Sequence, residues 1–584
     1  MIAPLLVLLL TGAVSKASHA GVWLADLSSS LDPNLWPEDL DDTINWGFQA
    51  VSGDEEPGDG KQIIGFAGPA EVVYNNAASH DLTYCGLLKT NESAVSVIVV
   101  SNSTTLKINY CTIQKAGAPL NVWEAYEWGY NSAVKVGHGS QARLTSVNIT
   151  THGRGAPGFT VDGRGFDLGE VELKFEEDKD IDETTNNDET TADKRVKRHQ
   201  KEKKRGVATT QEAPDGFQTS IMYSTFYSTG AWAPNVLALP KGLVYAMRNT
   251  FFTSGHRSPN FEARQDVNIF CEGCLLHTQG KGSALTYGAN ATVSLRYSAG
   301  AADTSPVAIL DGNTTLSLDT THLTSHNSKL GGIIAFNSAF NTLYQTISLV
   351  DSWLVVTDEN APGIWVGNTK AEIKLDKSHV EAKSGVILLA NNKSLAWGLG
   401  EEGVYGQEGA IKPAIVLATL SNIEMGGDIV AEDGAKVLWT AEKWVDWAGA
   451  ARPKNGGEIS VSLREGCRWA LTGHSIVKEL YGGDEEREQQ LPMSTFSGDL
   501  PELENVYGNG WDLYYLETAE KTAWLKGREY ALRNGGMLRP YTADRAPEIG
   551  RLGNGTGEDC GIGGMDSWVW PSLETKANGG GAIG

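Results

Sequence analysis

Three charged residues with a spacing of two stand out as candidates for chemistry. Glu262, Arg264 and Asp266 alternate along a segment with strand-like composition, so on a regular strand all three side chains would point to the same face. Two carboxylates beside a guanidinium could perform acid/base chemistry or hold a cation, because the arginine lowers the pKa of one carboxyl while their mutual repulsion raises the other. A surface ion pair is the simpler alternative, and it is the commoner use of such residues.

A cluster of aromatic residues is a second candidate site, for binding rather than catalysis. Trp123, Tyr126, Trp128 and Tyr130 fall within eight residues of the expected loop "PLNVWEAYEWGYNS". Aromatic rings on a loop can form a platform on which sugars or other flat ligands stack. The same residues could instead fill a hydrophobic plug beneath the loop.

A row of apolar residues is a third candidate, at positions that should face outward. A strand that is apolar on both faces is usually covered on both. We expect the aromatic C-terminal extension to cover this row, and otherwise the row would form a groove for a hydrophobic small molecule. The row consists of Leu237, Ile309, Ile334, Trp365, Ile387 and Val416.

The remaining motifs do not identify a reaction. Gly137-His138-Gly139 occurs in isolation, and we find no Ser-His-Asp signature, phosphate-binding loop or cofactor fingerprint. Cys271-x-x-Cys274 lacks the second ligand pair of a zinc site. We therefore assign no catalytic residue, no metal and no cofactor.

The element that must position these residues is a repeat. A small residue or proline is followed at +2 and +4 by apolar side chains, then by a turn and a second strand-like run. The anchors lie at Ser132, Pro157, Pro234, Pro259, Ser283, Pro306, Gly331, Pro362, Ser384 and Pro413, in steps of 22 to 31 residues apart from one step of 77. Such a period, with strands and no room for helices, is the signature of a solenoid.

Within each repeat, the alternation at +2 and +4 predicts inward-facing columns of apolar side chains. The repeats lack the Asn-Gly hairpin signals of a flat sandwich, so we predict an all-β, right-handed parallel β-helix. The expected inward pairs are Val134/Val136, Phe159/Val161, Phe261/Ala263, Leu285/Tyr287, Ile333/Ala335, Ile364/Val366, Val386/Leu388 and Ile415/Leu417.

The predicted organisation has four parts. We expect a signal peptide over 1–20, an N-terminal cap over 21–81, the β-helix over 82–481 and an irregular aromatic extension over 482–584. A charged insertion at about 172–213 interrupts the β-helix and should be disordered, and its dibasic pairs could be processing sites or a simple solvated charge run. The stretch "LETAEKTAWLKGREYALRNGG" has the spacing of a short helix.

Several features favour a secreted protein. The leader-like N-terminus, the even number of cysteines and the absence of any other apolar stretch long enough to span a membrane agree with export. Cys85 and Cys111 lie one coil apart, Cys271 and Cys274 could close a turn, and Cys467 with Cys560 would tie back the C-terminal segment. Seven Asn-X-Ser/Thr sequons are present: Asn91, Asn102, Asn148, Asn290, Asn313, Asn392 and Asn554.

The formal net charge of −24 argues against nucleic acid, anionic membranes and acidic polysaccharides as default partners. It indicates a soluble surface that repels itself.

The coils from about residue 82 to 480 resemble the secreted right-handed β-helix proteins of the pectin lyase-like superfamily, especially adhesin-like and autotransporter-passenger-like repeats. The stretches "NSAVKVGHGSQARLTSVNITTHGRGAPGFTV" and "ISVSLREGCRWALTGHSIVKEL" carry most of the likeness. The Gly-His-Gly triplet matches one element of polygalacturonases, but their other motifs are missing. The resemblance implies the fold and leaves function open, since the group includes binders, adhesins, lyases and hydrolases.

The sequence therefore predicts a secreted, glycosylated β-helix protein that binds extracellular or cell-wall polysaccharide. The alternative is an enzyme on the same scaffold. It would be either a polysaccharide lyase or hydrolase using Glu262, Arg264 and Asp266, or a cyclase- or isomerase-like protein acting on a hydrophobic small metabolite.

Overall fold

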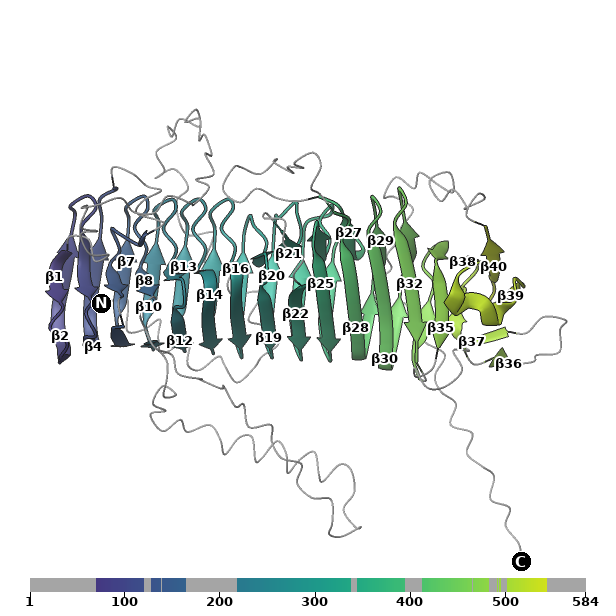
Figure 1. The fold of residues 1–584 in the computed structure, drawn as a ribbon, viewed down its shortest axis with the longest axis horizontal. Coiled ribbons are helices and arrows are strands. Elements are labelled where there is room, and N and C mark those ends of the chain that lie inside the picture. Colours follow the sequence, from purple (N-terminus) through teal and green to yellow (C-terminus); the bar gives the residue numbers. More distant parts are fainter. Residues whose placement is uncertain are drawn as a thin grey trace, which may run out of the picture. The chain divides into compact units, whose positions relative to one another are not determined.

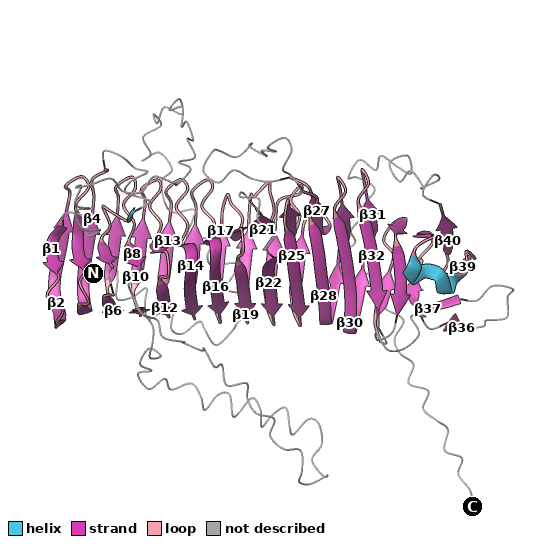
Figure 2. Ribbon diagram, in the orientation of Figure 1, coloured by secondary structure: helices cyan, strands magenta, loops and turns pink. Residues whose placement is uncertain are grey.

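A computed structural model describes residues 70–119, 128–137, 139–163, 218–337, 344–393, 412–464, 466–482, 491, 493–494 and 502–542. Nearly all of their regular structure is β, and neighbouring strands pair almost entirely in parallel (Figures 1 and 2). Each turn of the chain adds one strand to each of three parallel stacks, called A, B and C below. The predicted all-β parallel β-helix is thus confirmed.

Stack A contains the strands that follow the Ser and Pro anchors. Its members are β1 (Ala70–Tyr74), β3 (Ser96–Val100), β5 (Val134–Val136), β8 (Phe159–Asp162), β11 (Val236–Leu239), the first parts of β14 (Phe261–Glu272) and β16 (Thr286–Arg296), β18 (Ala308–Asp311), β21 (Ile333–Phe336), β24 (Ile364–Gly367), β27 (Val386–Asn391), β29 (Asp428–Ala431), β31 (Ala451–Pro453), β34 (Ser475–Val477), β38 (Leu513–Leu516) and β40 (Met537–Tyr541).

Stack B comes next in each coil. It consists of the first parts of β2 (Ser79–Thr90) and β4 (Thr105–Lys115), then β6 (Gln141–Thr145), β9 (Thr219–Met222), β12 (Leu243–Met247), the second parts of β14 and β16, β19 (Thr315–Asp319), β22 (Tyr344–Val350), β25 (Lys370–Asp376), the first parts of β28 (Ile415–Gly426) and β30 (Lys436–Ala448), β32 (Glu458–Leu463) and β35 (Glu479–Gly482).

Stack C completes the coil. It consists of the second parts of β2 and β4, then β7 (Asn148–Thr151), β10 (Thr225–Ser228), β13 (Thr250–Thr253), β15 (Leu275–Thr278), β17 (Ala299–Ala302), β20 (His322–Ser325), β23 (Trp353–Val356), β26 (His379–Ala382), the second parts of β28 and β30, β33 (Arg468–Ala470), β37 (Glu502–Tyr507) and β39 (Tyr530–Arg533). Besides these, β36 (Met493–Ser494) pairs antiparallel with β37, and η2 (Glu520–Leu525) is a 3-10 helix.

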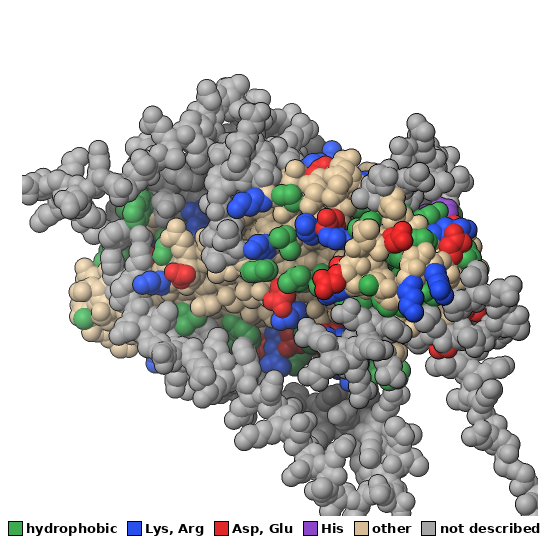
Figure 3. Space-filling model, turned by 45° about the vertical axis from the view of Figure 1, so that its right-hand side comes forward, with side chains coloured by type: hydrophobic (Ala, Val, Ile, Leu, Met, Phe, Trp, Pro, Cys, Tyr) green, Lys and Arg blue, Asp and Glu red, His purple; other side chains and the backbone are tan. Residues whose placement is uncertain are grey.

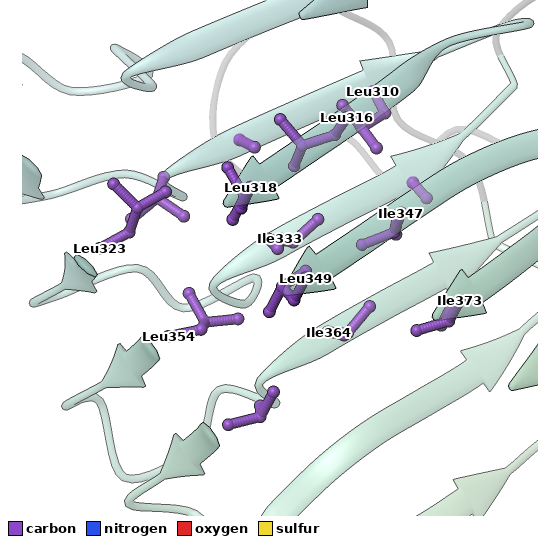
Figure 4. Packing of buried hydrophobic residues seen from close by; sticks show 14 of the residues in the cluster. Leu310, Leu316, Leu318, Leu323, Ile333, Ile347, Leu349, Leu354, Ile364 and Ile373 are labelled. Carbon is purple, nitrogen blue, oxygen red and sulfur yellow. The ribbon is translucent and has the colours of Figure 1, made fainter. Parts of the chain in front are cut away.

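The core lies between the stacks and is built from columns of like residues. Leu316 on β19 lies opposite Ile347 on β22, which lies opposite Ile373 on β25. Leu323 and Leu354 form a similar column in stack C (Figure 4). All five side chains are at most 1% exposed, so each added coil extends the same apolar interior.

Hydroxyl side chains join successive coils inside the turns. The backbone N–H of Ser258 donates to Oγ of Ser283 in the next coil (2.8 Å), and this hydroxyl donates to the Gly255 carbonyl (2.8 Å). The Ser283 N–H donates in turn to Ser305 Oγ (2.8 Å). Serine hydroxyls in these turns therefore satisfy buried backbone groups that the strands leave unpaired.

The coils extend past both predicted boundaries. β1 pairs in parallel with β3, so the first coil begins within the segment assigned to the N-terminal cap. At the other end β37 pairs with β33, and β38 pairs with β34, so residues 502–541 add strands to the same stacks. The structure therefore differs from the expectation of an extension that lies along stack A. The described part of that extension continues the solenoid, and residues 543–584 lie outside the described part of the chain.

The expected helix in this region is much shorter than its spacing suggested. Only Glu520–Leu525 is helical, and the same stretch continues into strand β39. Lys526 ends η2 in a left-handed conformation with φ 52°.

Some of the expected inward residues face outward instead: Tyr287, Ile415 and Leu417. Tyr287 belongs to a small apolar cluster outside the main core, and Leu417 is 38% exposed. Conversely, Ile387 and Val416 of the expected outer row belong to the core. The reasons are a register irregularity between Val386 and Leu388 and the position of Val416 in stack B, where it pairs with Ala371.

Candidate functional site

The charged triplet does not form a surface site. Glu262 is completely buried, and Arg264 binds its Oε1 through Nε and a terminal nitrogen, each at 2.7 Å. Asp266 is exposed and lies in a turn, because the register shifts between Arg264 and Val267 and both Gln265 and Asp266 have a φ of 57°. The structure thus brings two of the three residues together, as a shielded ion pair.

The outer row of stack A is also closed to solvent. Register places Glu262 between Leu237 and Tyr287, and the row continues through Ile309, Ile334 and Trp365. Trp365 is only 5% exposed, and all of these side chains are buried. Trp365 therefore does not present its ring to a ligand in this structure.

Two of the four aromatic residues of the predicted loop, Trp128 and Tyr130, belong to the described part of the chain. The Trp128 carbonyl accepts a hydrogen bond from Lys135 Nζ at 2.9 Å, and this ammonium lies 4.5 Å from the centre of the Tyr130 ring. Lys135 is 2% exposed, so these two aromatic residues help to enclose a buried cation. Trp123 and Tyr126 lie outside the described residues.

A different set of aromatic residues occupies the corner between stacks B and C. One residue per coil turns the chain there, and its φ is positive at each of the thirteen corners that the structure describes. We call these thirteen positions the corner column: Tyr84, Tyr110, Ser146, Tyr223, Arg248, Gly273, Tyr297, Thr320, Asp351, Lys377, Asn422, Trp444 and Gly466.

Hydrogen bonds between coils hold the corner column in line. The Tyr223 N–H donates to the Met247 carbonyl, and the Arg248 N–H donates to the Glu272 carbonyl one coil further on (3.1 and 2.8 Å). In several coils the residue after the corner is small or polar and points inward, as Ser224 and Asn249 do. The Ser224 N–H donates to Asn249 Oδ1 at 2.8 Å, which ties these two corners together.

The five aromatic residues of the corner column are among the most exposed large side chains of the described chain. Their exposed fractions are 75% for Tyr84, 54% for Tyr110, 42% for Tyr223, 53% for Tyr297 and 68% for Trp444. Tyr84 and Tyr110 stack with ring centres 4.9 Å apart. Gly466 is the corner residue of the next coil after Trp444. A Cβ built on it would lie 3.9 Å from the Trp444 ring, so glycine at this corner places no side chain against the indole.

The fold does not require aromatic residues at these corners. A bulky side chain in the left-handed region is a genuine outlier and costs about 1–2 kcal/mol. Eight of the thirteen positions hold Ser, Thr, Asp, Asn, Lys, Arg or Gly in the same conformation. Aromatic residues that cost stability here and leave 42–75% of their surface exposed therefore point to a role outside the core.

A groove at the C-terminal end of stack B is the second feature with accessible chemistry. It has a volume of about 230 Å³, and its floor includes Leu417 and Leu438 on adjacent coils. The helix η2, the larger helix drawn in cyan in Figure 2, borders it, because the Trp524 indole N–H donates to the Leu480 carbonyl of β35 (3.0 Å).

The groove wall holds three lysines and two glutamates. Lys478 and Lys436 both pair with Glu458, at 2.9 and 3.4 Å. Burial alone would raise the pKa of Glu458, but the two lysines outweigh it and hold the pKa below its ordinary value. Elsewhere on the surface that Figure 3 shows, acidic and basic side chains are interspersed rather than segregated.

The sulfur chemistry follows the spacing in the sequence. Cys85–Cys111 joins adjacent coils, and Cys271–Cys274 closes a turn within one coil. Cys467 is buried and bonds to no described cysteine, and burial raises the pKa of its thiol. Its predicted partner Cys560 lies outside the described residues, so that pairing stays a prediction.

Most of the sequon asparagines are accessible. Asn91, Asn102, Asn148, Asn290 and Asn313 are exposed, Asn392 is half-buried, and Asn554 is outside the described chain. Their glycosylation stays a prediction.

The described residues contain neither a group of metal ligands nor a helix that could span a membrane. No group of three or more His, Cys, Asp or Glu side chains there is arranged to bind a metal ion. None of the helices in this part of the chain has the length and hydrophobicity needed to cross a bilayer.

No family model, curated protein or solved structure matches the chain in our comparisons. The parallel β-helix therefore rests on the structure itself, and membership of the pectin lyase-like superfamily stays a prediction.

Proposed function

We propose that this chain is a secreted, glycosylated protein that binds extracellular or cell-wall polysaccharide through the aromatic residues of the corner column. The observation that carries the proposal is that five exposed aromatic side chains occupy strained positions which non-aromatic residues fill elsewhere in the same column. Strain that the fold does not need is a mark of function.

The geometry of the column suits a long, repetitive ligand. Coils repeat about every 4.8 Å, so Tyr84 and Trp444, eleven coils apart, are separated by about 50 Å along the stacks. The ring of a pyranose has an apolar face that packs on an aromatic side chain, and a chain of such rings can contact several platforms at once. Repeated weak contacts of this kind give affinity without a deep pocket.

Positively charged side chains contribute to this surface, although the surface as a whole is not basic. The Arg248 guanidinium lies 6.0 Å from the centre of the Tyr223 ring, and that of Arg296 lies 4.7 Å from the Tyr297 ring. These cations hold the rings and can donate hydrogen bonds to sugar hydroxyls. With a net charge of −24 on the chain, a neutral glycan is a better partner than an acidic one.

The enzyme alternative at Glu262 is not proposed further. A general acid or base must reach its substrate within hydrogen-bonding distance, whereas Glu262 is buried against Arg264 and Asp266 lies apart from it.

The test is retention of the secreted protein on a panel of insoluble glycans, with reducing-end and unsaturated-product assays on the same supernatants. We expect retention on at least one glycan without release of products. The double variant Tyr84→Asn/Tyr110→Ser should weaken binding about tenfold, because it removes two aromatic contacts worth about 0.5–1.5 kcal/mol each. Ser is used at position 110 because Asn there would create an Asn-Cys-Thr sequon.

The matched control is Lys377→Asn, which changes a non-aromatic member of the same column with φ 48°. It should bind like the wild type. Absence of retention on every glycan, or equal loss in the tyrosine variant and in the control, would refute the proposal.

A further inference from the structure

The groove beside η2 combines an apolar floor with a cation that has no carboxylate partner among the described residues. Lys521 is half-buried, and its Nζ donates to the Tyr481 hydroxyl at 3.2 Å and lies 4.3 Å from the centre of the same ring. Within the described chain this neutral phenol is its only polar contact. A partly buried ammonium that lacks a counter-ion is stabilised by an anion placed next to it.

The other four charges of the groove, on Lys436, Lys478, Glu458 and Glu479, sum to zero. Glu458 has two lysine partners, and Glu479 accepts a hydrogen bond from Ser460 Oγ at 3.2 Å. Counting the ionisable side chains of the wall, Lys436, Lys478 and Lys521 against Glu458 and Glu479, leaves one positive charge. The surplus sits in a protein whose overall charge is strongly negative.

The floor is unusually apolar for a solvent-facing strand surface. Leu417 lies directly opposite Leu438 on the next coil, and Ile415 flanks them. Leu417 is 38% exposed and Leu438 is half-buried, so a ligand could still remove apolar surface from water here.

We propose that this groove binds a small amphiphilic monoanion, an organic carboxylate whose apolar body lies on Leu417 and Leu438 and whose carboxylate pairs with Lys521. The Tyr481 hydroxyl is close enough to the ammonium to donate a second hydrogen bond to the same carboxylate. The site is separate from the corner column and independent of polysaccharide binding.

The probe is octanoate, compared with the uncharged octanamide of equal length, by isothermal titration calorimetry on the full chain. We expect octanoate to bind at one site and octanamide to bind at least tenfold more weakly, because only the carboxylate gains the ion pair. Lys521→Gln should remove this preference, and Lys521→Arg should keep it.

Two controls separate the groove from general effects. Lys374→Gln changes a lysine of stack B outside the groove, which pairs with Glu372 at 2.9 Å, and it should bind octanoate like the wild type. Leu438→Gln should weaken binding of octanoate and octanamide alike, since both ligands use the floor. Circular dichroism of each variant establishes that it has folded.

Equal affinity for octanoate and octanamide, unchanged binding in Lys521→Gln, or no binding of octanoate to the folded wild type would each overturn the inference. Loss of glycan retention would leave it untouched, because the two sites share no residue.

Discussion

Replacing Trp444 by Asn should leave the protein as stable as before while weakening its binding. Trp444 has a φ of 52°, a conformation that costs a bulky residue about 1–2 kcal/mol and that Asn adopts more readily. Its side chain is 68% exposed, so about one third of the contact surface of a buried side chain is lost, or about 0.5–1 kcal/mol. The two terms nearly cancel, and the free energy of unfolding should change by less than about 1 kcal/mol, towards greater stability.

Glycan binding should weaken in Trp444→Asn, because the exposed indole is itself a stacking surface for a sugar ring. One aromatic contact is worth about 0.5–1.5 kcal/mol, which corresponds to an affinity about two- to tenfold lower. Urea unfolding monitored by circular dichroism measures the first quantity. Affinity electrophoresis in gels containing a soluble form of the retained glycan measures the second, with Lys377→Asn run alongside.

Two results would refute this reasoning. A loss of more than about 2 kcal/mol in Trp444→Asn would mean that the indole belongs to the packed structure, in conflict with its exposure. Unchanged stability together with unchanged affinity would mean that the corner column is not the binding surface.

Three further predictions concern the scaffold. Ser283→Ala should lower the free energy of unfolding by about 1–3 kcal/mol, because it leaves the Ser258 N–H and the Gly255 carbonyl unsatisfied in a buried turn; urea unfolding equal to the wild type would contradict the role of the hydroxyls. Trp469→Ala should lose about 3–5 kcal/mol in the same assay, since this fully buried indole stacks on Trp447 at 4.6 Å and its N–H donates to Gly449; a loss below 1 kcal/mol would be inconsistent with that packing. Burial raises the pKa of Tyr515 above its ordinary value of about 10, so its contribution to stability is full below pH 10 and is lost as the pH rises further; Tyr515→Phe should flatten this alkaline fall, and an identical pH profile would exclude the assignment.

The repeat was predictable because each coil needs the same kinds of residue at the same offsets. Columns such as Leu316, Ile347 and Ile373 need apolar side chains at a fixed offset, and the turns need small hydroxyl residues such as Ser283. Both requirements leave a period in the sequence. The Cys85–Cys111 disulfide was also predictable, because the two cysteines lie one coil apart in the sequence.

Other features depend on backbone geometry that residue type does not reveal. Asp266 left the predicted face because two successive residues adopt positive φ, and a strand pattern alone does not report such a bulge. The last coils were missed because β37 to β40 lack the small anchors and carry Tyr514 and Tyr515 instead. Tyrosine is a poor predictor of a left-handed residue, and only six of the thirteen corners are followed by Ser, Thr or Asn, so residue type alone could not have indicated the corner column.

The hydroxyl hydrogen bonds between coils have a direction, and that direction bears on biosynthesis. The side chain that completes a turn comes from the following coil: Ser283 serves Ser258, and Asn249 serves Ser224. During synthesis from the N-terminus, the newest coil therefore still has open backbone groups until its successor emerges. Each coil is completed by the next, so a chain halted midway should present an adhesive, incomplete end to chaperones or to other nascent chains.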